Sequence, residues 1–395
     1  MSIQLTPLPL SAKADRVKMA EFGREIKGVD LKNVTPSQFA QIREALYKHE
    51  VILFRDIKIS PAEQAAFTKA FDPTSNGYGH AFDPSVSEIS TRLLQMHGIP
   101  GVPEVQLIGH GTVFNHEGVA RADLNHPTHK EFHKTVVSPE DEAKGYTRYY
   151  RWHIDAAFYD LSPPRVTSLY GAVVPKGIPQ IVRYDDGSGD ELPVTLGATA
   201  FASGNNTFEL LPAEYKSLAV RMKIKYAPHL YAWVNNTHAV SSGIAIENEG
   251  LEVPLGDLPP WTEEKRKVLS ALWKNEVTGK LHFQVHPSIA HELLIDPLPA
   301  GANRTGALYP DGAHITDLKT VREILFTIQR PGIASNLVYA HDWQKNDLIL
   351  FHNRGLMHSV TGALKDDDIR VFHQCNLHGS DDPAPPSVED IKKYA

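Results

Sequence analysis

The sequence predicts a mainly β protein with surrounding helices, built on a double-sheet jelly-roll core of the cupin kind, the double-stranded β-helix. Two observations predict this class. From Tyr146 onward, short runs of apolar and β-branched residues alternate with turn residues at close intervals, a texture typical of β-sandwiches and barrels. Apolar residues at helical spacing return only in a few segments between these runs, so we expect helices packed outside the sheets.

Residues 36–70 are predicted to form two helices around one strand, within an N-terminal helix and strand portion at residues 1–71. Apolar residues recur at helical spacing over residues 37–48, with Thr35 or Ser37 as the N-cap. Residues 51–54 are a short apolar run that predicts a buried strand. The second helix begins after Ser60, where a proline occupies the first helical position.

Residues 72–145 are rich in Gly, His, Pro and Asp. This composition predicts long loops with sparse regular structure, and long loops in a compact domain often carry function. We therefore expect a loop-rich lid here, followed by the jelly-roll core at residues 146–380. The whole chain, residues 1–395, is predicted to be a single domain with a sizeable core.

The predicted core consists of short strands with inserted helices. We expect strands at residues 166–174, 180–184, 191–195, 281–285, 348–351, 358–361 and 369–377, and helices at residues 210–216, 263–272 and 317–329. The Asp- and Gly-rich segment 185–190 is predicted to be a hairpin turn. It resembles a calcium-binding loop but lacks the glutamate that such loops carry at their last position.

Composition excludes several classes of partner. The formal charge of −7 argues against nucleic acid, which requires a basic surface. We expect no membrane span and no secretion signal, because the chain has no sufficiently long apolar run and no basic, apolar leader. Cys375 is the only cysteine, which fits a reducing, cytoplasmic setting. The expected partner is a small molecule, and the sequence leaves a homo-oligomer open.

His153 and Asp155 form the most informative motif. They are two positions apart in a stretch rich in aromatic and β-favouring residues, so in a strand their side chains would project from one face. His358, on a distant predicted strand, would complete a set of two histidines and one carboxylate. Such a set leaves one side of Fe(II) open for oxygen chemistry. Taken alone, His-x-Asp is a weak motif, and a surface histidine beside a capping aspartate explains it better than a metal site does.

Two further segments favour a polar pocket. Around His358, a strand, an Asn-Arg-Gly turn at residues 353–355 and a returning strand would hold the histidine on a rigid element. By period two, Arg370, Gln374 and Asn376 share one face of the last predicted strand. Such a face suits a polar pocket in which the arginine binds a carboxylate through two parallel hydrogen bonds. An edge strand with a solvated face would show the same pattern.

Smaller signals lie near these segments. Thr199 supplies a hydroxyl donor after a glycine turn, a second contact for an acid ligand. Ile349 and Phe351 share a strand face near His358 and could form an apolar wall for a substrate.

With these motifs the chain resembles the taurine/2,4-D dioxygenase (TauD/TfdA) family of Fe(II)- and 2-oxoglutarate-dependent oxygenases. The resemblance covers most of the chain and is carried by residues 22–31, 49–56, 152–155, 197–199 and 351–358 together with Arg370. Within the family the chain is most similar to the fungal xanthine dioxygenases, through residues 149–157, the hairpin at 183–187 and the spacing of Arg370, Gln374 and Asn376.

The resemblance implies roles for individual residues. The iron ligands fall on His153, Asp155 and His358, the 2-oxoglutarate residues on Arg370 and Thr199, and the substrate side on Gln374 and Asn376. The implied cofactors are Fe(II), 2-oxoglutarate as co-substrate, and O2. The implied reaction couples decarboxylation of 2-oxoglutarate to oxidation of a substrate C–H bond.

Two positions depart from the family pattern. The usual aspartate before Asn-Arg is His352 here, and the usual pair of glycines is Leu196-Gly197. Neither change removes a ligand. We expect the first to alter the support of the iron site.

A group of histidines offers an alternative metal site. His126, His129 and His133 fall near one helical face, but a carboxylate is lacking and a proline disturbs the helix, so we favour substrate-loop or capping roles over zinc. The resemblance also implies a cation near this segment, which Asn125 precedes and Lys130 follows.

The substrate alternatives stay open. The first expectation is a xanthine-like oxopurine hydroxylated at carbon. The alternative is a small branched aliphatic amino acid in fungal secondary metabolism, with hydroxylation, desaturation or ring closure, such as aziridine formation, as the outcome. A hypothesis of another class is an inactive family member that acts as a binding protein. The complete triad with Arg370 argues against it.

Overall fold

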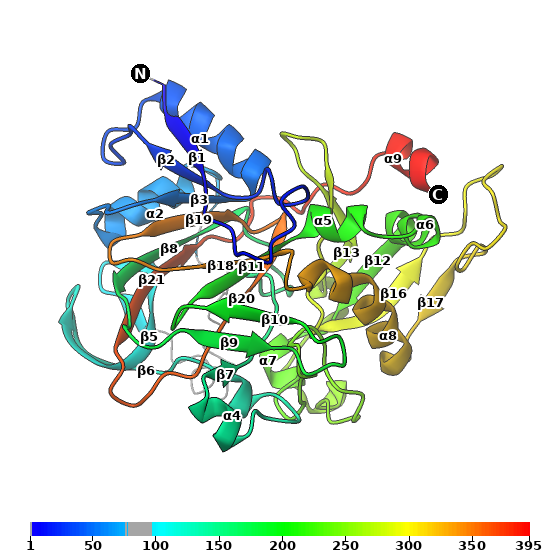
Figure 1. Cartoon of the computed structure of the whole chain (residues 1–395). Helices are drawn as coiled ribbons and strands as arrows, with labels where there is room; N and C mark the ends of the chain where they lie inside the picture. Colours follow the sequence, from blue (N-terminus) through cyan, green and yellow to red (C-terminus); the bar gives the residue numbers. More distant parts are fainter. Residues whose placement is uncertain (1, 76, 78–96) are drawn as a thin grey trace.

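One large sheet of mostly antiparallel strands organises the chain (Figure 1). The computed structural model describes residues 2–75, 77 and 97–395. The strand order of this sheet is β1 (Gln4–Pro7), β2 (Arg24–Lys27), β3 (Val51–Phe54), β19 (Leu348–His352), β8 (Val166–Val173), β21 (Arg370–Asn376), β5 (Val102–His116) and β4 (His97–Ile99), with β6 (Val119–Leu124) paired to β5. Strands β2 and β3 pair in parallel.

A smaller sheet faces the large one. Its order is β18 (Val338–His341), β11 (Thr199–Ser203) and β20 (Leu356–Val360). Phe201 and Leu356 of this sheet share a buried cluster with Leu169, Ile349 and Phe372 of the large sheet. Burying each such side chain contributes about 1.5–3 kcal/mol. The face-to-face packing therefore fixes the spacing between the two sheets.

The two predicted N-terminal helices and the strand between them are confirmed, whereas β1 and β2 were not predicted. Helix α1 (Pro36–His49) begins at Thr35, whose side chain accepts from the backbone N–H of Gln38 in a reciprocal capping box. The strand β3 is fully buried. Helix α2 (Pro61–Lys69) begins at Ser60 with the same capping arrangement. Both helices lie against the large sheet (Figure 1).

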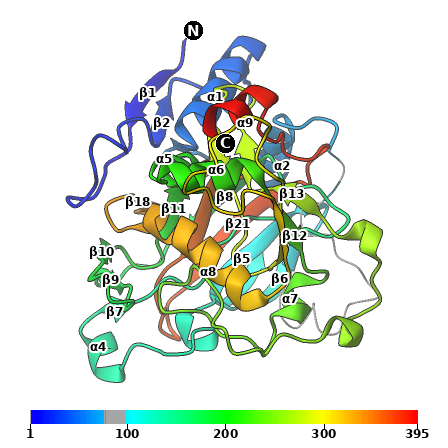
Figure 2. The same cartoon turned by 90° about the vertical axis from the view of Figure 1, so that its right-hand side faces the viewer.

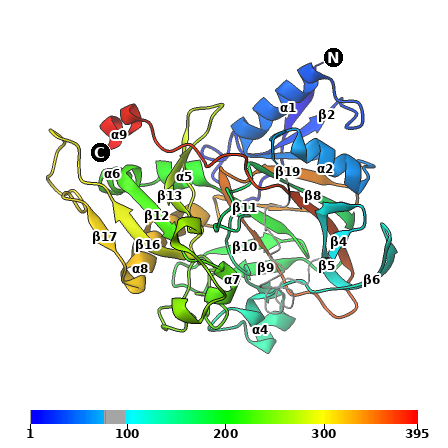
Figure 3. The same ribbon diagram turned by 180° about the vertical axis from the view of Figure 1, so that it is seen from behind.

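A lobe is inserted between β11 and β18 (Figures 2 and 3). It contains the sheet β13 (Val268–Ser270), β12 (Met222–Tyr226), β16 (Ala290–Ile295) and β17 (Ala313–Ile315), the pair β14 (Leu272–Lys274) and β15 (Leu281–Phe283), and the helices α5 (Gly204–Glu209), α6 (Ala213–Arg221), α7 (Leu230–Trp233) and α8 (Leu318–Gln329). Helix α8 matches its predicted bounds and buries Val321, Leu325 and Ile328. The C-terminal helix α9 (Val388–Tyr394) packs on α6.

Other core predictions are confirmed with small shifts in bounds. Strands β9 (Gln180–Arg183) and β10 (Glu191–Val194) form the predicted hairpin, and β9 also pairs with β7 (Tyr146–Thr147). Helix α4 (Pro139–Ala143) lies at the surface beside β7. No helix within the described ranges is long and apolar enough to cross a bilayer.

The prediction of sparse structure over residues 72–145 was wrong for its second part. Strands β5 and β6 form a long hairpin there, closed by Glu117 and Gly118 at positive φ. The glycines that suggest loops are instead required by close strand contact. A Cβ on Gly109 would come within 1.8 Å of the Arg370 carbonyl oxygen on the neighbouring strand. The rest of the predicted lid falls partly on residues 76 and 78–96, outside the described residues.

Two predicted helices were also misplaced. Residues 263–272 contain only a 3-10 turn, Glu263–Lys265, after which Leu269 pairs with Ile224 in the lobe sheet. Cross-strand pairing therefore overrides the helical spacing. The helix predicted at residues 210–216 begins later, at Ala213, because Pro212 separates it from α5.

The Asn-Arg-Gly turn connects the two sheets. Strand β19 pairs with β3 and β8 in the large sheet, whereas β20 pairs with β11 in the small sheet. The sequence suggested a strand that returns beside the first, and this pairing is wrong. Gly355 permits the tight crossing, because a Cβ there would lie 2.4 Å from Nδ1 of His352.

Candidate active site

The side chains of His153, Asp155 and His358 converge between the two sheets. One ligand atom from each residue lies within 4.8 Å of the others. The Asp155 Oδ1 atom is 3.8 Å from Nε2 of His153 and 3.7 Å from Nε2 of His358. Among the described residues, this is the one group of three or more His, Cys, Asp or Glu side chains arranged to hold a metal ion.

The His153 segment is extended without forming a regular strand. His153 makes a single antiparallel bridge to His358, with N–H to carbonyl distances of 3.0 Å in both directions. Asp155 follows at a bend. The predicted strand was therefore wrong, but the consequence drawn from it was right, since both side chains reach the same centre.

Both histidines can present Nε2 to a metal. Nδ1 of His153 lies 3.1 Å from the Arg151 carbonyl oxygen, which selects the Nδ1–H tautomer. Burial, with His358 as the next cause, holds the pKa of His153 well below its ordinary value. The imidazole is thus neutral, which is the metal-binding form.

Asp155 is held by partners that the sequence analysis missed. Asn353 accepts from the Asp155 N–H at 3.0 Å and donates to the Asp155 carbonyl at 2.8 Å. The Thr167 hydroxyl donates to Asp155 Oδ2 at 2.8 Å. Gln374, predicted for the substrate side, donates to the same oxygen at 3.3 Å. The turn between the sheets therefore positions a ligand on a distant segment.

The triad opens into a cavity of about 430 Å³. Thr199, Arg370 and Gln374 line this cavity, as predicted. Ile349 and Phe351 are fully buried between the sheets and do not line it. The Phe351 ring instead packs 4.7 Å from the His358 ring.

Asn376 is also absent from the cavity wall. It is fully buried near the end of β21, where neither side-chain polar atom has a hydrogen-bond partner.

Arg370 fits an acid ligand. It is 2% exposed, and no carboxylate of the described residues pairs with it. Burial lowers the pKa of Arg370 to about 9. Nearby, Thr199 accepts a hydrogen bond from the Trp343 indole at 3.0 Å, so its hydroxyl proton can be donated elsewhere. Gly197, at φ +73°, lets the chain pass beside the guanidinium.

The histidines predicted as an alternative metal site, His126, His129 and His133, do not form one within the described structure. His126 lines the cavity, and its Nε2 lies 3.3 Å from the Thr361 carbonyl. Nε2 of His129 accepts a hydrogen bond from the N–H of Val137. Nε2 of His133 lies 2.8 Å from the carbonyl oxygen of Tyr150.

The charged residues predicted near these sites have other partners. Lys130 pairs with Glu142 at 2.5 Å and does not line the cavity. The predicted Asp-rich hairpin turn is confirmed, with Asp186 and Asp190 paired to Arg330.

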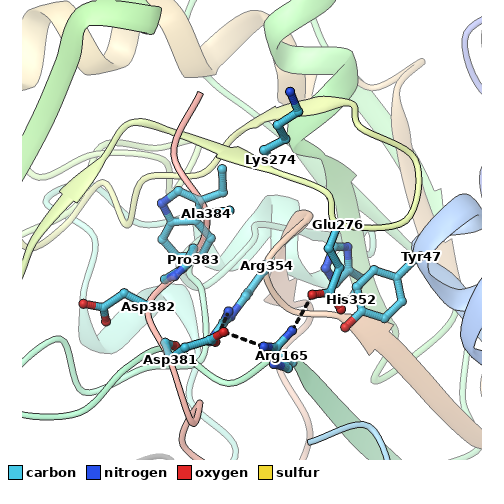
Figure 4. Close-up of a pocket in the computed structure, with 11 residues that line it drawn as sticks. Tyr47, Arg165, Lys274, Glu276, His352, Arg354, Asp381, Asp382, Pro383 and Ala384 are labelled. Carbon is cyan, nitrogen blue, oxygen red and sulfur yellow. Dashed lines mark hydrogen bonds and ion pairs between the residues drawn. The ribbon is translucent and has the colours of Figure 1, made fainter. Parts of the chain in front are cut away.

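His352 does not support the triad, which corrects our expectation. Its ring packs 4.5 Å from Tyr47, next to a separate cavity of about 70 Å³ (Figure 4). Arg165 and Arg354 beside it are both paired with Asp381. The support of the triad comes from the following residue, Asn353.

Comparison with known proteins agrees with this geometry. The model of the "Taurine catabolism dioxygenase TauD, TfdA family" matches residues 6–376. The chain therefore belongs to this family, and it is a non-haem dioxygenase whose cofactors are Fe(II), 2-oxoglutarate and O2.

Several curated proteins resemble it over nearly their whole length. An alpha-ketoglutarate-dependent xanthine dioxygenase of Schizosaccharomyces pombe is 46% identical, covering 98% of this chain and 91% of the relative. One of Neurospora crassa is 42% identical, covering 98% of this chain and 89% of the relative. A taurine dioxygenase structure from Burkholderia xenovorans has a TM-score of 0.53 at 18% identity, over 98% and 94% of the two chains, and shows a shared fold.

Proposed function

We propose that this protein hydroxylates a xanthine-like oxopurine. The observation that carries the proposal is the identity of 42–46% with xanthine dioxygenases along nearly the entire chain. Xanthine has one carbon-bound hydrogen, at C8, so its hydroxylation gives uric acid. One oxygen atom of O2 enters that product, and the other enters succinate as 2-oxoglutarate loses CO2.

The residues have separable tasks in this proposal. His153, Asp155 and His358 hold Fe(II), and Arg370 with Thr199 holds the distal carboxylate of 2-oxoglutarate. When bound, the iron and 2-oxoglutarate together supply the oxidant for the C–H bond. The protein orients both small molecules, and the cavity limits access of water to the reacting atoms.

The finer architecture is part of the same proposal. We interpret the two facing sheets as a double-stranded β-helix, or jelly roll, and the whole chain as one catalytic domain. The face-to-face cluster around Phe201 and the family match over residues 6–376 support this interpretation. The proposal also includes a cytoplasmic location. It takes a small molecule, and neither nucleic acid nor a membrane, as the partner, and it leaves a homo-oligomer open.

A substrate panel tests the proposal. The protein is supplied with Fe(II), 2-oxoglutarate and O2, and succinate release is measured with oxopurines and with branched aliphatic amino acids. We expect xanthine to stimulate succinate release and to yield an equal amount of uric acid. The variant His153→Ala should lose this activity, whereas His314→Ala, an exposed histidine on β17, should keep it.

Other outcomes would contradict the proposal in different ways. Stimulation by an amino acid but not by any purine would replace the substrate. No stimulation by any compound, with retained ligand binding, would favour a binding protein.

A further inference from the structure

Arg151 is a second buried cation on the cavity wall. It is 8% exposed and lines the same cavity as the triad. No carboxylate of the described residues pairs with its guanidinium, and its Nε has no hydrogen-bond partner. A buried charge without an anion is costly. A ligand that brings a negative or oxygen-rich edge to Arg151 would offset that cost.

Three aromatic rings hold the guanidinium in place. Its central carbon lies 5.4 Å from the ring centroids of Phe132, Tyr150 and Tyr231. These three residues also line the cavity. Arginine stacks on aromatic faces while its N–H groups remain free to donate in the plane. Tyr231 also shares a side-chain hydrogen bond with Arg151, whereas the Nε–H of Arg151 has no partner and stays free to donate.

The place of Arg151 in the chain fixes its relation to the metal ligands. It precedes His153 by two residues, and its carbonyl oxygen accepts from Nδ1–H of that histidine. Two residues of extended chain span about 7 Å, comparable with the long axis of a purine. Arg151 lines the same cavity as His153, Asp155 and His358, so one planar ligand in that cavity can contact Arg151 and lie next to the triad.

The two unpaired arginines occupy different surroundings. Arg370 lies beside Gly197 and Phe372, whereas Arg151 lies among Phe132, Tyr150 and Tyr231. If Arg370 binds 2-oxoglutarate, Arg151 remains for the other ligand of the cavity.

We propose that Arg151 is the substrate anchor, which binds the anionic C–O edge of an oxopurine while the adjacent rings contact its flat face. This inference rests on the proposed function, since it takes the oxopurine as the ligand. Arg151 acts here as a binding residue that sets which carbon of the substrate faces the metal.

Binding without turnover tests the anchor. Xanthine is titrated calorimetrically into protein loaded with Mn(II) and N-oxalylglycine, an unreactive 2-oxoglutarate analogue. We expect Arg151→Gln to weaken xanthine binding about 10- to 100-fold, the loss typical of a charge-assisted hydrogen bond. Arg151→Lys should recover part of the lost xanthine affinity, because lysine keeps the positive charge but lacks the planar pair of N–H donors. N-oxalylglycine binding should stay within about threefold of the wild type.

The control is Arg121→Gln, an exposed arginine paired with Asp123 on β6. It should leave xanthine binding unchanged. Unchanged xanthine binding in Arg151→Gln, or equal loss of xanthine and N-oxalylglycine binding, would overturn the anchor. So would an absence of xanthine binding to the wild type.

Binding and turnover separate the two proposals. Xanthine binding that depends on Arg151 but gives no uric acid under Fe(II) and O2 would support the anchor and contradict the proposed reaction.

Discussion

Two pairs of arginines, three of them buried and Arg165 half-buried, distinguish two sides of this molecule, which we call the structural side and the ligand-binding side. Arg165 and Arg354, beside the small cavity of Figure 4, are paired with carboxylates; Arg165 contacts Glu276 at 2.8 Å and Arg354 contacts Asp381 at 2.9 Å. Arg151 and Arg370 line the large cavity, and no carboxylate of the described residues pairs with either. The first pair ties segments of the chain together, whereas the second pair has no carboxylate partner among the described residues and faces the cavity.

Burial alone therefore does not identify a functional arginine. Arg354 and Arg370 are both nearly inaccessible, and burial lowers the pKa of both. The difference lies in their partners. A buried cation that faces a cavity and has no anion beside it is a candidate binding point for a negatively charged molecule.

The largest effect is expected from a change in the triad, which is the proposed metal site on the ligand-binding side. Asp155→Asn replaces a charged ligand by a neutral amide while keeping its shape. We expect turnover to fall at least about 100-fold, since loss of an outer partner alone costs 10- to 100-fold. Succinate release and Mn(II) titration measure the effect. Asp342→Asn, at an exposed site, is the control, and retained activity in Asp155→Asn would remove Asp155 from the triad.

Substitution of Arg370 tests directly whether the arginines of the two sides differ in function. Arg370→Met should raise the 2-oxoglutarate requirement at least about 30-fold, because a buried charge pair is lost from the complex. The ligand-free variant should be as stable as the wild type or more stable, because an uncompensated cation is removed. Kinetics and thermal unfolding measure the two effects.

Arg354→Met is the matched variant and should show the opposite behaviour. Arg354 donates to the Pro163 carbonyl and to Asp381, so its loss should destabilise the protein by about 1–3 kcal/mol. The 2-oxoglutarate requirement should not change. If both variants destabilise the ligand-free protein equally, the distinction between the two sides is wrong.

Asn353 joins the two sides, because it lies in the sheet-connecting turn and holds Asp155. Asn353→Ala leaves the N–H and carbonyl of Asp155 without this partner. We expect metal affinity to fall about 10- to 100-fold, measured by Mn(II) titration. Asn205→Ala, which removes a bond to the Leu281 carbonyl in the lobe, should leave metal affinity intact. Equal affinities in both variants would contradict the role of the turn.

Glu50 is a buried acid on the structural side. Its Oε1 accepts from the Ser203 hydroxyl at 2.7 Å, and burial raises its pKa from 4.5 to about 8. Nδ1 of His282 lies 3.9 Å from this Oε1, but burial lowers the pKa of His282 to about 4, so this histidine is neutral above that pH. Lys280 lowers the pKa of Glu50 only as a minor cause. The folded state therefore binds a proton more tightly than the unfolded state. This contribution to stability is full below about pH 4.5 and is lost as pH rises through about 8, by at most about 1.4 kcal/mol per pH unit.

Glu50→Gln should remove that part of the pH dependence. Urea unfolding from about pH 5 to 9 should show the difference between variant and wild type growing with pH. Glu44→Gln, on the exposed face of α1, should unfold with the wild-type pH dependence. A difference that does not vary with pH would contradict the raised pKa.

The sequence was most informative where residue type and spacing both carry chemistry. His153, Asp155 and His358 converge as expected even though the first two lie outside a regular strand. Spacing of two positions is preserved in any extended segment, so the prediction did not require a paired strand. Strand β21 also presents Arg370 and Gln374 to the cavity as period two predicts, but Asn376, predicted on the same face, does not line it.

The sequence was least informative where tertiary contacts decide. The glycines of β5 resemble those of a loop, and only the nearness of β21 explains them. Asn353 acts on a residue 198 positions away, which no local pattern reveals. Arg151 did leave a signal, because Arg151-x-His153-x-Asp155 extends the same period by one step. The spacing alone does not indicate a binding residue; the structure adds that no carboxylate of the described residues pairs with the Arg151 guanidinium.

The bridge between His153 and His358 has a consequence for synthesis of the chain. Translation delivers Asp155 and His153 long before His358, and the bridge itself cannot close until β20 exists. Closing so long a loop carries an entropic cost that the packed sheets must offset. A site that takes ligand atoms from both segments is therefore complete only when most of the polypeptide has been made.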